Sequence, residues 1–247
     1  MNCIGIIPAR YASSRFPGKP LVMIQGVSMV MRVYQQVLKA ASLNHVVVAT
    51  DDKAILLHVE KQGGHAVMTS ELHRSGTERC YEAAMIMAGE LHIDVVVNVQ
   101  GDEPFIDPQQ IEKVLSSFSD PSVEIATLAK KINDQAELFN PNAVKVAIGE
   151  DGRAIYFSRH PIPYVRGCGQ DEWIKKQTFY KHIGLYAYRL DTLKRIVALP
   201  PAALEKAESL EQLRWLANGI PVHVELTETE SQAVDTPEDL LKLINNA

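Results

Sequence analysis

Three short runs of β-branched and other apolar residues constrain the fold of this 247-residue chain more than any other feature. They lie at 3–7, 46–50 ("VVVAT") and 95–99 ("VVVNV"). Such runs, without polar alternation, are typical of strands buried on both faces of a parallel sheet. Segments with helical spacing follow the runs or lie between them, at 28–41, 53–62 and 78–91. The alternation predicts a doubly wound, mostly parallel sheet flanked by helices.

The second half of the chain has a different pattern, with more short strands and fewer long helices. A weak strand at 66–68 belongs to the first half, and the second half has predicted strands at 124–130, 144–148, 154–157, 183–188 and 222–226. Further helices are predicted at 108–118, 208–217 and 237–245. The stretch 161–181, with Gly167 and Gly169, reads as an excursion from the sheet. We expect one domain over residues 1–247, since the chain can bury one large core.

Composition excludes several classes of partner. The net charge of -5 argues against nucleic acid or an anionic membrane, both of which favour a broad basic face. The 3 cysteines are widely spaced, which is typical of a reducing compartment and of neither a disulfide framework nor a zinc site. The apolar stretch before Pro8 is too short for a signal peptide or a membrane span. We therefore expect a cytoplasmic protein.

The loop "PARYASSRFPGKP" at 8–20 opposes the overall charge, because it carries Arg10, Arg15 and Lys19 while the first acidic residue is Asp51. Two guanidinium forks and an ammonium beside backbone N–H groups suit a polyphosphate. The loop is not a P-loop, because Lys19 is followed by proline. A solvated surface loop is the simpler alternative.

Acidic residues follow the predicted strands and supply a candidate metal site. The loop at 8–20, Thr50–Asp52 and "QGDEP" at 100–104 each follow a parallel strand, so they should converge on one edge of the sheet. Asp102 beside phosphates would need a divalent cation between them, and Mg²⁺ uses one or two carboxylates plus phosphate oxygens. Turn chemistry before a proline is the alternative interpretation of Asp102. Asp235, just before a helix start, is a second candidate ligand.

Other polar segments are more ambiguous. "HRSGTER" at 73–79 leads into a helix whose start could face an anion, or it is a capping sequence with Thr77 before Glu78. His182 precedes the apolar stretch "IGLYAY". No Ser-His-Asp or Cys-His arrangement indicates a covalent nucleophile.

Taken in order along the chain, several motifs carry a family resemblance. They are "IIPARYASSRFPGKPL", "VVVATDD", "SGTER", "VNVQGDEP", "FNPNAVKV", "YFSR", "KHIGLYAYR", "LEQLRWL" and "VDTPEDL". Together they resemble the 3-deoxy-D-manno-octulosonate (Kdo) cytidylyltransferases, from residue 4 to about 241. The resemblance implies a Rossmann-like mixed sheet of the nucleotide-diphospho-sugar transferase type, with 161–181 as a dimerisation or lid excursion. It also implies a homodimer that makes CMP-Kdo and pyrophosphate from CTP and Kdo with Mg²⁺, for lipopolysaccharide biosynthesis.

The resemblance also implies roles for individual residues. Arg10, Arg15 and Lys19 would hold the CTP triphosphate, and Ser75, Gly76 and Gln100 would lie near the nucleotide. Asp102 and Asp235 would bind Mg²⁺ and, with Lys19 and Arg15, form the catalytic set. The sugar pocket would be lined by Arg79, Gln100, Arg159, His182, Tyr186 and Glu211.

The chain departs from the family pattern in places, and other functions stay open. It reads "GVSM" at 26–29, "VRGCGQDEW" at 165–173 and "AVD" at 233–235 where the family commonly has other residues. The second departure falls in the segment expected to form dimer contacts and part of the lid. A cytidylyltransferase for sialic acid or an 8-amino Kdo analogue is one alternative. A catalytically inactive nucleotide-binding regulator is another.

Overall fold

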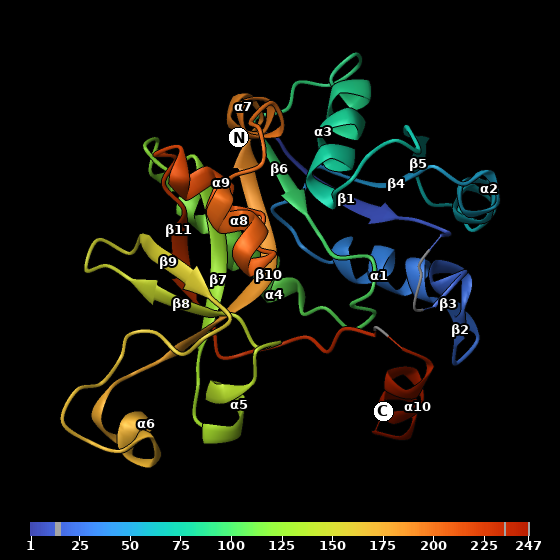
Figure 1. The fold of residues 1–247 in the computed structure, drawn as a ribbon. Helices are drawn as coiled ribbons and strands as arrows, with labels where there is room; N and C mark the ends of the chain where they lie inside the picture. Colours follow the sequence, from blue (N-terminus) through green and yellow to red (C-terminus); the bar gives the residue numbers. More distant parts are fainter. Residues whose placement is uncertain (13–15, 235, 247) are drawn as a thin grey trace. The chain divides into compact units, whose positions relative to one another are not determined.

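The computed structural model describes residues 1–12, 16–234 and 236–246 (Figure 1). It divides into two compact units. Unit 1 comprises residues 1–112, 187–197 and 231–247, and unit 2 comprises 113–186 and 198–230. Each unit is described by itself below. The prediction of a single domain over the whole chain stays a prediction.

Unit 1 is built on a parallel sheet in the order β6-β1-β4-β5. Ile4 at the centre of this sheet pairs with His45 on one side and with Val96 on the other. The three predicted apolar runs are therefore confirmed as three of its strands. The strands are β1 (Cys3–Ala9), β4 (His45–Thr50), β5 (Ala66–Met68) and β6 (Val95–Asn98).

Helices cover both faces of the unit 1 sheet. An ideal Cβ on Gly5 of β1 would lie 3.0 Å from Val37 in α1 (Met29–Val37), so Gly5 faces α1. Pro8 faces α3 (Gly76–Met87), since an ideal Cβ on Gly76 would lie 3.5 Å from its Cγ. Alternate residues of a strand point to opposite faces, so α1 and α3 lie on opposite sides. Unit 1 also contains β2 (Met23–Ile24), β3 (Val27–Ser28), α2 (Lys53–Lys61), α7 (Leu190–Val197) and α10 (Pro237–Asn246), and α4 (Pro108–Ser116) begins in it.

Unit 2 contains both parallel and antiparallel strand pairs. Strand β11 runs parallel to β7, whereas β8 pairs antiparallel with β10 and with β9. Together with the parallel sheet of unit 1, this confirms the predicted mixed, mostly parallel fold. The strands are β7 (Ile125–Lys131), β8 (Lys145–Ile148), β9 (Ala154–Ser158), β10 (Tyr180–Arg189, its last residues in unit 1) and β11 (His223–Leu226).

The helices of unit 2 are short. The helix predicted at 208–217 is present as α9 but begins later, because Ser209 adopts a left-handed φ of 52° that breaks the helical path. A separate short helix, α8, ends just before this break. The helices are α5 (Gln135–Phe139), α6 (Trp173–Lys176), α8 (Ala203–Glu208) and α9 (Gln212–Ala217).

The predicted excursion 161–181 carries its own apolar anchor. Trp173 in α6 is buried in a cluster with Ile132, Leu138 and Phe179. Tyr164, by contrast, is exposed and contacts the Trp173 ring edge-on, with ring centroids 5.1 Å apart. The segment is thus packed within unit 2 through Trp173 and Phe179, and its role in dimerisation stays a prediction.

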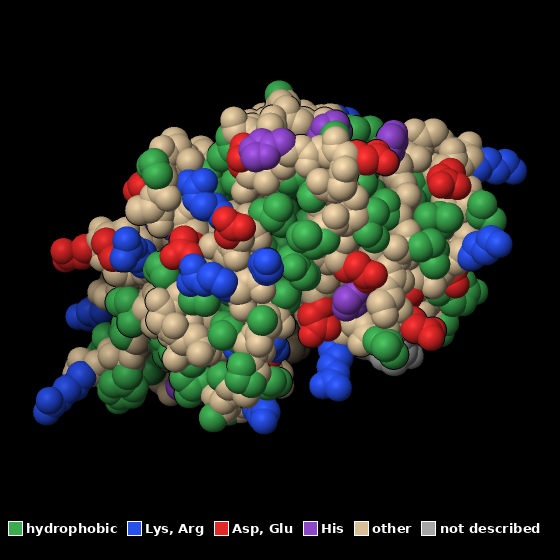
Figure 2. All heavy atoms as spheres, turned by 90° about the horizontal axis from the view of Figure 1, so that it is seen from above, with side chains coloured by type: hydrophobic (Ala, Val, Ile, Leu, Met, Phe, Trp, Pro, Cys, Tyr) green, Lys and Arg blue, Asp and Glu red, His purple; other side chains and the backbone are tan. Residues whose placement is uncertain are grey.

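The surface mixes charges of both signs. On the face seen in Figure 2, Lys and Arg side chains stand among Asp and Glu side chains, with hydrophobic groups between them. None of the helices in the described part of the chain is both long and apolar enough to cross a bilayer.

Candidate active site

A pocket of about 350 Å³ opens in unit 1 beyond the carboxyl ends of β1 and β6. It brings together five of the residues predicted from the sequence: Arg10, Lys19, Gly76, Gln100 and Asp102. The convergence of the 8–20 loop and the "QGDEP" segment is therefore confirmed. The remaining lining residues are Pro8, Ala9, Ala12, Pro20 and Gly101.

Two glycines allow the loops of the pocket to form. An ideal Cβ on Gly101 would lie only 2.6 Å from the Pro8 carbonyl oxygen, so the turn after β6 can approach β1 only without a side chain. Gly18 adopts a left-handed φ of 71° and donates its N–H to the Tyr11 carbonyl at 3.0 Å. This closure places Lys19 at the start of a short 3-10 helix, Lys19–Leu21, facing the pocket.

Lys19 is held by two groups from distant parts of the chain. Its Nζ lies 2.8 Å from Asp102 Oδ2 and donates to the Val234 carbonyl at 3.0 Å. The Val234 N–H in turn donates to the Asp102 carbonyl at 2.9 Å. Val234 is buried against Ile24 and Met29, so the segment that carries it is anchored by apolar contacts. The ammonium is thereby fixed beside the carboxylate that the sequence marked for metal binding.

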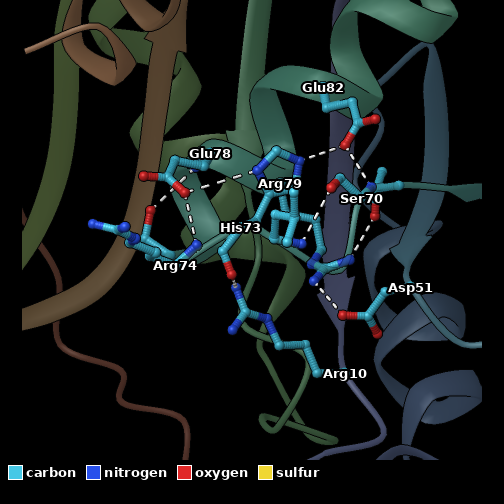
Figure 3. Close-up of polar contacts among 11 residues, drawn as sticks. Arg10, Asp51, Ser70, His73, Arg74, Glu78, Arg79 and Glu82 are labelled. Carbon is cyan, nitrogen blue, oxygen red and sulfur yellow. Dashed lines mark hydrogen bonds and ion pairs between the residues drawn. The ribbon is translucent and has the colours of Figure 1, made fainter.

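Arg10 lies at the pocket with its guanidinium directed at a loop carbonyl. Its Nη2 donates to the backbone oxygen of His73 (Figure 3). Desolvation lowers the pKa of Arg10, and the nearby charge of Arg79 lowers it further. A guanidinium has five N–H donors, so this contact leaves donors for an anion in the pocket.

The loop that presents the His73 carbonyl is fixed by carboxylates of α3. His73 Nε2 is bonded to Glu82, and its Nδ1 lies 3.8 Å from Glu78 (Figure 3). The Ser70 N–H also donates to Glu82, at 2.7 Å. Desolvation raises the pKa of Glu82, but the hydrogen bonds from Ser70 and His73 outweigh it, so that the pKa ends below its ordinary value.

Arg79 occupies a different environment from the one expected for a sugar-binding residue. Its side chain is fully buried, with Nη2 2.6 Å from Asp51 and Nη1 2.6 Å from Thr69 Oγ1. It does not line the pocket described above. Its role in the sugar pocket stays a prediction, while its contacts tie α3 to the ends of β4 and β5.

The start of α3 differs from the capping sequence predicted around Thr77. The helix begins at Gly76, and Ser75 is its N-cap, accepting from the Glu78 N–H at 3.2 Å. Thr77 lies inside the first turn and is buried. The Ser75 cap has a simple physical advantage, since it leaves Gly76, which has no side chain, at the pocket wall.

Four predicted sugar-pocket residues, Arg159, His182, Tyr186 and Glu211, lie in unit 2. The His182 ring is 5.1 Å from Phe157 and 5.2 Å from Tyr186 between centroids, and its Nε2 lies 3.0 Å from Thr127 Oγ1. Desolvation in this aromatic cluster lowers the pKa of His182 to about 3. Desolvation also raises the pKa of Tyr186, and the charge of Glu211 adds to the effect.

Arg159 is engaged with backbone oxygens of unit 2. Its Nε donates to the Glu208 carbonyl at 2.7 Å and its Nη1 to the Pro141 carbonyl at 3.0 Å. The nearby Lys145 is fully buried and donates to the Asn140 carbonyl at 2.9 Å. Burial lowers the pKa of Lys145, and the charge of Arg159 lowers it further. The sugar-pocket role of Arg159 stays a prediction.

Two predicted residues, Arg15 and Asp235, fall outside the described part of the chain. Within residues 1–12, 16–234 and 236–246, no group of three His, Cys, Asp or Glu side chains could hold a metal ion. The predicted ligand pair thus consists of Asp102, in the pocket, and a residue that directly follows Val234. The carbonyls of His73 and Val234 were not predicted, because backbone groups leave no signal in residue type.

Comparison with known proteins agrees with this geometry. A sequence model of the cytidylyltransferase family matches residues 4–228. A 3-deoxy-manno-octulosonate cytidylyltransferase from Parabacteroides distasonis is 54% identical, over 99% of this chain and 97% of its own length. One from Cytophaga hutchinsonii is 50% identical, over 100% of this chain and 98% of its own.

A solved structure has the same fold. It is described as CMP:2-keto-3-deoxy-manno-octonic acid synthetase complexed with CTP, and it superimposes with a TM-score of 0.91 at 41% identity. The alignment covers 100% of this chain and 98% of that one. The chain therefore belongs to the cytidylyltransferase family and, within it, to the family of the 3-deoxy-manno-octulosonate cytidylyltransferases.

Proposed function

We propose that this chain transfers the cytidylyl group of CTP to the anomeric hydroxyl of 3-deoxy-D-manno-octulosonate, giving CMP-Kdo and pyrophosphate. The observation that carries the proposal is the Lys19–Asp102 ion pair, at 2.8 Å, in a pocket that also contains Arg10. Full-length identity of 54% to a 3-deoxy-manno-octulosonate cytidylyltransferase supports the choice of substrates.

The reaction requires one bond to form and one to break at the α-phosphorus. The anomeric oxygen of the sugar attacks, the bond to the β-phosphate oxygen breaks, and pyrophosphate leaves with the electron pair. The hydroxyl proton passes to a nearby carboxylate or to solvent. Arg10 and Lys19 would hold the triphosphate and stabilise the charge that grows on the leaving group. Arg15 would join them, as the resemblance implies.

The donors at Asp102 suit Mg²⁺, since hard carboxylate oxygens beside phosphates are what this ion prefers. Asp102 is partly exposed at the pocket, and its carbonyl is bonded to the residue before Asp235, so the two predicted ligands belong to adjoining segments. A bound Mg²⁺ would neutralise phosphate charge and align the triphosphate. The dependence on Mg²⁺, the homodimer and the cytoplasmic location rest on the family resemblance.

The sugar side of the reaction falls to residues of unit 2 in this proposal. Within unit 2, His182, Tyr186, Glu211 and Arg159 would contribute to Kdo binding. His182 stays uncharged at neutral pH, since its pKa is about 3, so it would act as a neutral hydrogen-bonding group.

The test is pyrophosphate release from CTP and Mg²⁺ with Kdo, with sialic acid, with an 8-amino Kdo analogue and with no sugar. Release that depends on Kdo supports the proposal. Release only with another acidic sugar keeps the chemistry and changes the substrate. Binding of CTP without release in any mixture would favour the nucleotide-binding regulator.

A further inference from the structure

Asn98 carries a polar atom that the described part of the protein leaves without a partner. The residue ends β6 and is only 4% exposed. Its Oδ1 is buried and has no hydrogen-bond partner among the described residues. More than nine in ten buried polar groups in proteins have such a partner. An exception in the core of a binding domain needs a physical reason.

The amide of Asn98 lies behind two residues of the pocket wall, Pro8 and Gly76. Asn98 pairs with Ile6 of β1, so it shares a sheet face with Pro8, two residues further along that strand. An ideal Cβ on Gly76 would lie 3.5 Å from Pro8 Cγ and 3.7 Å from Asn98 Nδ2. Both Pro8 and Gly76 line the pocket. The amide nitrogen therefore lies next to the gap between two pocket-lining residues, and the unpartnered oxygen belongs to the same amide group.

Gly76 keeps this gap open. A methyl group there would meet its neighbours at ordinary van der Waals distance, so an alanine would fit without a clash and would cover the amide. Alanine is also the better helix former. Neither packing nor helix formation therefore requires a glycine at this position. Access to the amide of Asn98 would require one.

We propose that Asn98 is a further substrate-binding residue, which hydrogen-bonds the nucleoside half of the bound nucleotide. The proposal rests on the proposed function, since it assumes that CTP occupies this pocket. The triphosphate has charged partners in Arg10 and Lys19 of the same pocket. A neutral amide offers one donor group and one acceptor, and it matches a neutral edge that has both, such as the ribose hydroxyls or the cytosine amino and ring-nitrogen pair.

The decisive variant is Asn98→Leu, of similar size and without polar atoms. Removing an unpartnered buried polar group does not weaken folding, so the melting temperature without ligand should be equal to or above that of the wild type. Affinity for CTP, measured by calorimetry without sugar, should fall about tenfold or more, because the nucleoside loses a buried hydrogen bond. Affinity for inorganic tripolyphosphate should not change.

Asn44→Leu is the matched control. Asn44 Oδ1 accepts from the Cys3 N–H at 2.8 Å, next to the start of β4 and away from the pocket. The same substitution there should lower the melting temperature by roughly 2–4 °C, since it removes a satisfied hydrogen bond. It should leave CTP affinity unchanged.

Gly76→Ala tests the same contact with Asn98 in place, and it decides the matter if the leucine variant does not fold. It should fold normally and bind CTP about tenfold more weakly, with tripolyphosphate affinity unchanged. Comparing the affinities for CTP, dCTP and UTP shows whether Asn98 contacts the ribose or the base. If Asn98→Leu removes a preference over dCTP the partner is the ribose, and if it removes a preference over UTP the partner is the base.

Three results would overturn the inference. A lower melting temperature in Asn98→Leu with unchanged CTP affinity would show that the amide is satisfied within the folded protein, for example by a buried water. An equal loss of CTP and tripolyphosphate affinity would place the amide on the phosphates. A wild type that binds no CTP would remove the proposed function itself, a failure distinct from the other two.

Discussion

Two pairs of little-exposed titratable residues, Lys19 and Arg79 in unit 1 and His182 and Tyr186 in unit 2, differ in how burial affects their charge. In unit 1, Lys19 and Arg79 are little exposed but each has a carboxylate within 3 Å, so the charges are kept and paired. In unit 2, His182 and Tyr186 are packed among aromatic rings, and desolvation shifts both pKa values toward the neutral form. The difference teaches that burial alone does not set the charge state; the partner does.

This contrast fits the two tasks of the proposed reaction. A triphosphate and a metal ion require fixed charges, whereas a polyhydroxylated sugar ring is well served by neutral donors and acceptors whose state does not change with pH. The four predictions below test either side of the comparison, from the largest expected effect to the smallest.

Removing the carboxylate of the unit 1 pair should have the largest effect. Asp102→Asn keeps the size and removes the charge that faces Lys19 and the predicted metal, so turnover should fall about 10³-fold. The measurement is pyrophosphate release, with circular dichroism to show that the fold is kept. Asp235→Asn should behave alike if it is the second ligand. Near-normal turnover at ordinary Mg²⁺ would end the metal-ligand assignment.

Breaking the buried pair of unit 1 should cost stability. Arg79→Met leaves Asp51 without its partner and should reduce the free energy of unfolding by about 3 kcal/mol, measured by urea denaturation. The exposed Arg74 provides the control, since Arg74→Met should change stability by less than about 0.5 kcal/mol. Adding Asp51→Asn to Arg79→Met should recover part of the loss, and strict additivity would argue against a paired charge.

The charge of Lys19 should matter most for the chemical step. Lys19→Ala should lower kcat about 10²-fold and weaken CTP binding less than tenfold, because charge on the leaving group grows in the transition state. Lys39→Ala, at an exposed lysine bonded to Gln36, should leave both unchanged. Equal losses in binding and in kcat would instead make Lys19 a ground-state anchor.

The uncharged state of His182 predicts that the stability of the protein depends on pH. His182 has a folded pKa of about 3, against about 6.5 when unfolded, so between these values the unfolded state binds more protons. Stability is then complete above pH 6.5 and falls as the pH drops toward 3, by at most about 1.4 kcal/mol per pH unit from this group.

His182→Gln should reduce the dependence of stability on pH, measured as the urea midpoint at several pH values between 4 and 7. The ratio of turnover at pH 7 to turnover at pH 8 should be the same as in the wild type. The matched control is His65→Gln, at an exposed histidine, which should keep the wild-type slope. A slope that survives in His182→Gln would contradict a neutral, desolvated imidazole.

Local pattern was sufficient for much of the fold. The apolar runs became β1, β4 and β6 almost residue for residue, because strands buried on both faces need uninterrupted apolar sequence. Strand β10 was predicted at 183–188 but spans Tyr180–Arg189, since Tyr180 and Lys181 pair with β8 across a long sequence separation. Such pairing leaves no trace in the strand's own residues.

Short elements escaped prediction for local reasons. The hairpin of β2 and β3 turns at Gln25 and Gly26, both with positive φ, and a Gln-Gly pair is a weaker signal than Asn-Gly. Helix α7 has a clear apolar stripe of Leu193 and Ile196 and could have been recognised by its spacing.

The candidate site, like the fold, could be predicted only in part. Convergence of the loops after β1 and β6 follows from a general rule of α/β sheets and was predictable. The burial of Arg79 against Asp51 was not predictable, because a solvent-exposed arginine in the first turn of a helix would have the same sequence pattern. Backbone partners such as the Val234 carbonyl depend on where the chain returns, which only the folded protein determines.

That return of the chain also orders events during synthesis. Lys19 leaves the ribosome well before two of its partners, which come from residues 102 and 234. The lysine must therefore wait until residue 234 has been added before these contacts can form. Incomplete translation products should carry the cationic loop without the constraint that aims it, so that only chains translated past residue 234 can become competent.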